Sequence, residues 1–111
     1  MGFARLDEVK NLRPPAEQIA SLVPDRTRFF GFRLDETVRA AMPFYAGISP
    51  QHTEDVEQLN AWLGDSAPCS ILTLERRLEA TWPRLQYPYE ILLRVDMNPG
   101  RTVLLIANQV R

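Results

Sequence analysis

Hydrophobic residues recur at helical spacing near the start of the chain. Residues 6–12 carry leucine and valine at every third position, and Pro14–Pro15 should end this helix because the residue before a proline avoids the α region. A second helix is expected over 15–23, with Pro15 in its first turn and Pro24 after its end. The pattern predicts a pair of N-terminal helices.

The next segment, 27–34, alternates as a strand does. Phe30, Phe32 and Leu34 fall on one face, and the residues between them fall on the other. Gly31 in the middle indicates a bulge or a close approach of another backbone segment. We expect one β-strand here.

Two helices are predicted after this strand. Asp35 is a good N-cap for the first, which Pro43 should end or kink. Ser49–Pro50 resembles a cap followed by a first-turn proline, so the second is expected to begin there and to end at Gly64.

Segment 68–81 fits two patterns. Residues 69–74 read as a strand, but Ile71, Leu74, Leu78 and Trp82 also fit the period of a helix. The helix, over about 68–81, is the preferred interpretation.

The C-terminal pattern is a hairpin. Two β-rich runs, 90–97 and 101–110, flank Asn98-Pro99-Gly100, which has the proline and glycine of a type II turn. Consecutive apolar residues in both runs, 91–93 and 103–107, indicate strands that are covered on both faces or half-covered by a partner. We expect 103–107 to be buried and one strand of the sheet to pair with, or pack against, a second copy of the chain.

Together these elements predict an α+β fold. The sheet is expected to be small and antiparallel, with about three strands including the C-terminal hairpin, packed against four to five helices. A length of 111 residues fits one domain, 1–111.

Composition narrows the classes of function. The net charge of -1 offers no general attraction for nucleic acid, and no apolar run is long enough to span a membrane. A single cysteine and the lack of a signal-peptide pattern favour a reducing, cytoplasmic setting. Arginine far outnumbers lysine, which suggests a high-GC bacterial or phage genome.

Candidate catalytic groups are few. His52 and Cys69 are the only histidine and cysteine, so they are the one pair that could serve a small enzyme or a small-molecule site with an apolar pocket. They are too few for a zinc site, and the glycines have no phosphate-binding spacing, so no metal and no cofactor is predicted.

A third candidate is single-stranded nucleic acid. Arg28, Phe30, Phe32 and Arg33 interleave basic and aromatic residues on one strand, a pattern that can stack bases. Core phenylalanines flanked by strand-end arginines explain the same pattern, so nucleic acid is not the preferred partner.

The preferred function is non-catalytic binding of another protein, as an adaptor, inhibitor, immunity protein or self-associating scaffold; the partner is unidentified, and a second copy is one alternative. Tyrosine, tryptophan and arginine dominate interface hot spots. They gather in and beside the loop 83–89, and further aromatics lie in the link 44–48. The candidate binding residues are Trp82, Arg84, Tyr87, Tyr89, Phe44 and Tyr45.

Overall fold

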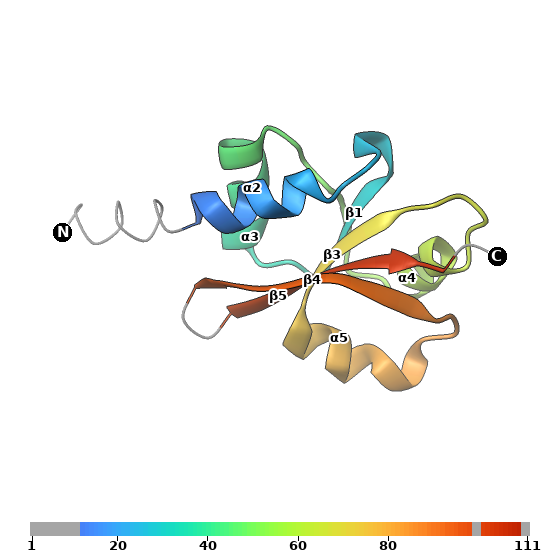
Figure 1. The fold of residues 1–111 in the computed structure, drawn as a ribbon. Coiled ribbons are helices and arrows are strands. Elements are labelled where there is room, and N and C mark those ends of the chain that lie inside the picture. Colours follow the sequence, from blue (N-terminus) through green and yellow to red (C-terminus); the bar gives the residue numbers. More distant parts are fainter. Residues whose placement is uncertain (1–11, 99–100, 110–111) are drawn as a thin grey trace.

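A computed structural model of the protein describes residues 12–98 and 101–109 (Figure 1). In chain order the elements are α2 (Arg13–Ser21), the 3-10 turn η1 (Arg26–Arg28), β1 (Phe29–Phe32), α3 (Glu36–Ala41), the π-helical turn η2 (Met42–Ala46), β2 (Gln51–Thr53), α4 (Val56–Leu63), β3 (Ser70–Leu74), α5 (Glu75–Thr81), the 3-10 turn η3 (Trp82–Arg84), β4 (Tyr89–Asn98) and β5 (Arg101–Asn108). Most of the expected first helix, and the proline and glycine of the hairpin turn, lie outside the described residues.

The sheet is larger than the sequence predicted, and it is mixed. Its five strands lie in the order β2-β1-β3-β5-β4. β1 pairs in parallel with both β2 and β3, whereas β5 pairs antiparallel with β3 and β4. The expectation of a three-stranded antiparallel sheet was therefore wrong, because two further strands, β2 and β3, were not predicted.

β3 occupies the first half of the expected helix over 68–81. All five of its residues are buried, with Ile71 packed in one core and Leu72 and Leu74 in the other. A strand covered on both faces loses the alternation of apolar and polar residues that identifies strands, so its apolar positions matched a helical period equally well. Only the second half, α5, is helical.

β2 was missed for a different reason. The strand has three residues and none is buried, so no hydrophobic pattern marks it. Ser49–Pro50 precedes this strand and caps no helix. α4 begins later, at Val56, where the side chain of Asp55 accepts a hydrogen bond from the backbone N–H of Glu57 at 3.0 Å. The predicted end at Gly64 is confirmed.

Helices cover both faces of the sheet. α2 and α3 pack with Phe29, Leu72 and Leu105 in one core, and α4 and α5 pack with Phe32 and Ile106 in the other. Figure 1 shows α2 and α3 above the strands and α5 below them. Of the described helices, none is both long and apolar enough to cross a membrane.

Two predictions about β1 and the helix after it can be compared with the structure. The strand is shorter than 27–34, and Leu34 lies beyond its end, in the core opposite to that of Phe30 and Phe32. A Cβ on Gly31 would lie 2.7 Å from the Leu34 side chain, so a side chain, and not the backbone that was expected, approaches Gly31 closely. Asp35 caps α3 as predicted, accepting from the Val38 N–H at 2.9 Å.

β5 lies inside the sheet, between β3 and β4. The two-stranded C-terminal hairpin is confirmed, and the four residues from Val103 to Ile106 are buried, while Ala107 is partly exposed. The monomer's own helices and strands bury this run. β4 forms one outer edge of the sheet, and β2 forms the other.

Candidate functional site

Exposed hydrophobic residues of the described chain concentrate around β4. Four of the six large ones lie there: Trp82 is 64% exposed, Tyr87 45%, Ile91 52% and Leu92 36%. We call these four residues the β4 surface. Isolated exposed apolar residues are common on proteins, but a contiguous group of them marks an interaction site.

Three residues of the β4 surface border one shallow hollow. Its volume is about 620 Å³, and its walls come from η3, from the loop before β4 and from the start of β4. The lining residues are Trp82, Leu85, Gln86, Tyr87, Pro88, Tyr89 and Ile91. Three predicted binding residues, Trp82, Tyr87 and Tyr89, thus meet in one place.

A buried amide on α4 holds this loop in position. The Asn60 side chain donates to the Arg84 carbonyl at 3.0 Å and accepts from the Gln86 backbone N–H at 2.9 Å. Gly64 adds space, because a Cβ there would lie 2.7 Å from the ring of Tyr87. Arg84 contacts Asn60 through its backbone carbonyl, whereas its side chain is exposed.

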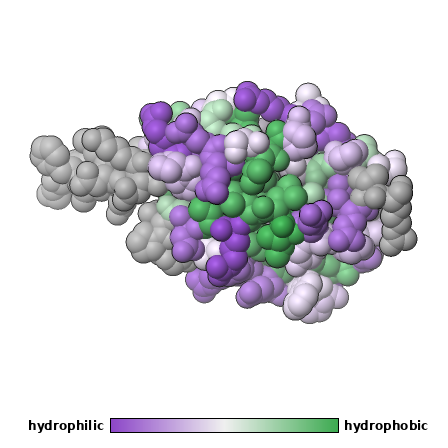
Figure 2. All heavy atoms as spheres, in the orientation of Figure 1, coloured by the Kyte–Doolittle hydropathy of each residue, from purple (hydrophilic) through white to green (hydrophobic). Residues whose placement is uncertain are grey.

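β4 itself is irregular where it meets this hollow. Ile91 lies opposite Ile106 and Leu93 lies opposite Leu105, so Leu92 is an extra residue in a β-bulge. A bulge leaves its extra residue unpaired in the ladder and changes the direction of a side chain. Figure 2 shows hydrophobic side chains gathered in the middle of the face formed by α2 and β4.

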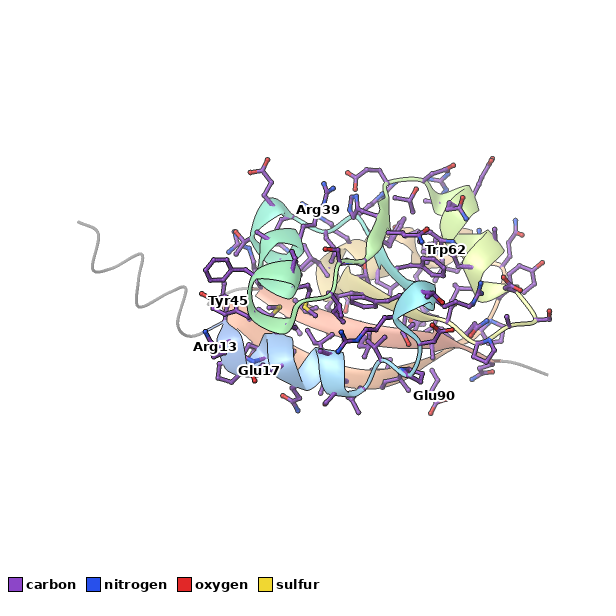
Figure 3. All side chains as sticks on the ribbon, turned by 90° about the horizontal axis from the view of Figure 1, so that it is seen from above. Arg13, Glu17, Arg39, Tyr45, Trp62 and Glu90 are labelled. Carbon is purple, nitrogen blue, oxygen red and sulfur yellow. The ribbon has the colours of Figure 1, made fainter. Side chains whose placement is uncertain are left out.

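Phe44 and Tyr45 form a separate apolar site. They line a hollow of about 340 Å³ with Leu12 and residues of α3, and it shares no residue with the hollow at β4. Phe44 is 73% exposed, whereas the hydroxyl of Tyr45 is buried with no hydrogen-bond partner among the described residues. The guanidinium of Arg13 lies 5.3 Å from the centre of the Tyr45 ring (Figure 3).

The basic and aromatic residues of β1 are part of the fold. Phe30 is buried and stacks on Trp62 with ring centres 4.2 Å apart, and Phe32 is fully buried. Arg28 forms an ion pair with Asp65 at 2.9 Å and donates to the Pro68 carbonyl. Neither ring is therefore free to stack a base in this fold.

His52 and Cys69 are not brought together. His52 lies on β2 and Cys69 lies directly before β3, and β1 separates these two strands. Cys69 is buried, and burial raises the pKa of its thiol, which disfavours the reactive thiolate. No three His, Cys, Asp or Glu side chains of 12–98 and 101–109 gather where they could hold a metal ion.

His52 has a structural contact instead. Its Nε2 accepts a hydrogen bond from the Leu34 backbone N–H at 2.9 Å, so this nitrogen carries no proton. Burial lowers the pKa of His52, and the positive charges of Arg39 and Arg77 lower it further, against the opposing effect of Glu54. The 3.4 Å contact between Nε2 and Glu54 is consequently not an ion pair.

A third hollow, which is polar, lies at the carboxyl ends of the three parallel strands. Arg33 follows β1, Glu54 follows β2, and Arg76 and Arg77 lie in the first turn of α5, directly after β3. With Asp35, Arg101 and three smaller or apolar residues they enclose about 730 Å³. We call this space the arginine hollow.

Several contacts hold the arginine hollow together. Arg101 pairs with Asp35 at 2.6 Å, Arg33 Nε donates to the Glu54 carbonyl at 3.0 Å, and Arg77 donates to the Arg33 carbonyl. Arg33 has a φ of 47°, a left-handed conformation that costs a residue other than glycine about 1–2 kcal/mol.

Sequence reasoning missed the arginine hollow and the two buried asparagines, Asn60 and Asn108. The available signal was the alternation of strand and helix from 29 to 81, which would have placed Arg33, Glu54 and Arg76 at one end of a parallel sheet. Once β2 and β3 were missed, those residues appeared unrelated. Asn60 carried no pattern of its own.

Comparison with known proteins adds a fold relationship. No protein-family model matches the chain, and the curated proteins contain no match. Among solved structures, the chain is similar to ArnT from Cupriavidus metallidurans bound to undecaprenyl phosphate, with a TM-score of 0.60 and 15% identity. The similarity covers 87% of this chain but only 20% of that one, and at this identity it shows a shared fold alone.

Proposed function

We propose that this chain is a protein-binding domain, and that it binds an extended segment of a partner polypeptide along β4. The observation that carries the proposal is the coincidence of an outer edge strand with the β4 surface. An edge strand offers unpaired backbone N–H and C=O groups, to which an extended peptide can add as a further strand.

The hollow beside the strand supplies specificity in this proposal. An added strand projects alternate side chains to the two faces of the sheet. Those on the α5 face would meet the walls formed by Trp82, Tyr87 and Ile91. Tryptophan and tyrosine are among the residues whose truncation costs interfaces the most.

The partner segment expected from this surface is apolar. β4 presents Ile91 and Leu92 together with the charged residues Glu90 and Arg94. Arg94 is already paired with Glu75 at 2.7 Å, and Glu90 points away from the body of the protein (Figure 3). The fold also occurs in ArnT as one fifth of a longer chain, which is compatible with a binding role inside a larger assembly.

A displayed peptide library tests the proposal. Peptides selected on the wild-type protein are expected to be extended and apolar, to protect the β4 amides from hydrogen exchange, and to lose binding to Ile91→Asp. Phe44→Asp is the matched control, because it makes the same kind of change at the separate apolar site. Peptides that bind Ile91→Asp as well as wild type would contradict the proposal.

Sedimentation of the same three proteins identifies the occupant. A wild-type protein that self-associates, with the association lost in Ile91→Asp and kept in Phe44→Asp, places a second copy of the chain on β4. A monomer that binds selected peptides places another protein there. If Phe44→Asp alone loses binding, the interface lies at Phe44 and Tyr45 instead.

A further inference from the structure

We propose that the arginine hollow binds the phosphate group of a small phosphorylated ligand, a function separate from the binding of protein along β4. The proposal rests on where the hollow lies in the fold, on its charge, on the donors that remain free, and on the backbone of Arg33.

The position is the one at which open α/β sheets bind ligands. β1 and β3 are parallel neighbours, and the helices that follow them pack on opposite faces: Val38 of α3 lies in one core and Leu78 of α5 in the other. The chain therefore leaves these two strands in opposite directions and opens a crevice at their carboxyl ends. Arg33 and Arg77 stand at this crevice.

The charge of the hollow fits a dianion. Four arginines face two carboxylates, Asp35 and Glu54, which leaves an excess of two positive charges. Asp35 is already neutralised by Arg101, and the Glu54 side chain is 70% exposed. A phosphate monoester carries about -1.5 to -2 at neutral pH. The whole chain has a net charge of -1, so the positive charge is local.

Guanidinium donors remain free to bind the anion. Each guanidinium has five N–H donors in a planar fork that matches phosphate oxygens. Arg33 and Arg77 each use one of their donors on a backbone carbonyl within the hollow. Arg76 is exposed, and its guanidinium has neither a hydrogen bond nor an ion pair to the described residues.

The backbone of Arg33 is the fourth observation. Its left-handed conformation suits glycine or asparagine, yet the sequence places a long charged side chain there, at the rim of the hollow. Residues held in sparsely populated conformations cluster at functional sites. The volume of about 730 Å³ lies within the range of small-molecule sites.

Calorimetric titration with inorganic pyrophosphate tests the site, at low ionic strength where charges are screened least. Arg76→Ala and Arg33→Asn are each expected to raise the dissociation constant by roughly tenfold, the loss of one hydrogen bond to a charged group. Asparagine tolerates the left-handed backbone, so Arg33→Asn should stay folded and lose only the bond from the Arg33 guanidinium to the Glu54 carbonyl.

Arg26→Ala is the matched control. It removes the same charge from an exposed residue at the opposite end of β1, and it should bind as the wild type does. Equal weakening in all three variants would mean general charge attraction and would overturn the proposal. Unchanged affinity in Arg76→Ala and Arg33→Asn would overturn it as well.

A second arm distinguishes a soluble phosphate from a lipid headgroup. Vesicles of phosphatidylcholine, with and without phosphatidic acid, are mixed with the same four proteins and sedimented. Binding that requires phosphatidic acid and follows the same order of variants supports the site with a lipid source. The proposal fails if neither pyrophosphate nor these vesicles bind the wild-type protein.

Discussion

The two strands of the C-terminal hairpin have similar sequences and different surroundings. β4 reads YEILLRVDMN and β5 reads RTVLLIAN, and each has a run of three or more aliphatic residues. In β5 this run is enclosed between β3 and β4 and between two layers of helices, whereas in β4 Ile91 is 52% exposed. Neighbouring strands, which lie far away in the sequence, decide whether an apolar run forms core or surface.

Aspartate substitutions in β5 and β4 test this difference, and they are expected to give the largest change in unfolding free energy. Leu105 and Leu104 are 1% and 4% exposed and lie in opposite cores. Leu105→Asp and Leu104→Asp are each expected to cost more than about 4 kcal/mol of unfolding free energy, because each removes core packing and buries an unpaired charge. Ile91→Asp should change it by about 0.5 kcal/mol or less.

Urea unfolding followed by circular dichroism measures all three variants. The reading of β5 as interior and β4 as surface is contradicted if Leu104→Asp or Leu105→Asp yields a folded monomer of normal stability. It is equally contradicted if Ile91→Asp unfolds at the concentration where the wild type is a monomer.

The sequence was informative where the determinants of structure are local. The hairpin strands, the Asp35 cap and the end of α4 at Gly64 depend on residues a few positions apart, and they were predicted correctly. β2 and β3 depend on pairing with β1, twenty to forty residues away, which leaves no local pattern. The strand order could not be derived without them.

The candidate sites also divide into those set by residues close in sequence and those set by long-range strand pairing. Trp82, Tyr87 and Tyr89 were predicted as a group because they are neighbours in sequence, and the structure places them around one hollow. The arginine hollow draws on segments around 33, 54, 76 and 101, which only the parallel sheet brings together. Phe30 and Phe32 are buried because α4 and α5 cover their face, in agreement with the preferred interpretation of them as core phenylalanines.

Two buried asparagines, one associated with each strand of the hairpin, allow the same comparison through single side chains. Asn108, at the end of β5, accepts from the Cys69 N–H at 2.9 Å and donates to the Ala67 carbonyl at 2.8 Å. Asn60 makes two similar bonds to the loop before β4, part of which is exposed. A buried donor left without a partner costs about 1–3 kcal/mol, and water relieves part of that cost at an exposed loop.

We therefore expect Asn108→Ala to lower the unfolding free energy by about 2–3 kcal/mol and Asn60→Ala by about 1 kcal/mol. Hydrogen exchange separates their effects. Asn108→Ala should speed exchange at Cys69, and Asn60→Ala should speed it at Gln86 and weaken peptide binding along β4. Equal losses of stability would show that the loop before β4 is as tightly enclosed as the end of β5.

The opposite edge strand, β2, gives the smallest and most specific effect, a dependence on pH. Neutral His52 accepts from the Leu34 N–H, and burial lowers its pKa below the ordinary value of 6.5. Below that value the unfolded chain takes up a proton that the folded protein does not, so stability falls as the pH drops from about 6.5 towards the lowered pKa, and levels off below it. One proton limits the slope to about 1.4 kcal/mol per pH unit.

Urea unfolding between about pH 5 and 7.5 isolates the effect of the histidine. Carboxylates with lowered pKa values, such as Asp65 and Glu75, lose their contribution to stability only below the ordinary pKa values of 3.8 for aspartate and 4.5 for glutamate. His52→Gln keeps an acceptor without a titrating group and should flatten the dependence over this range. A variant as pH-dependent as the wild type would place the titrating group elsewhere, whereas Ile91→Asp, on the β4 edge, should leave the dependence unchanged.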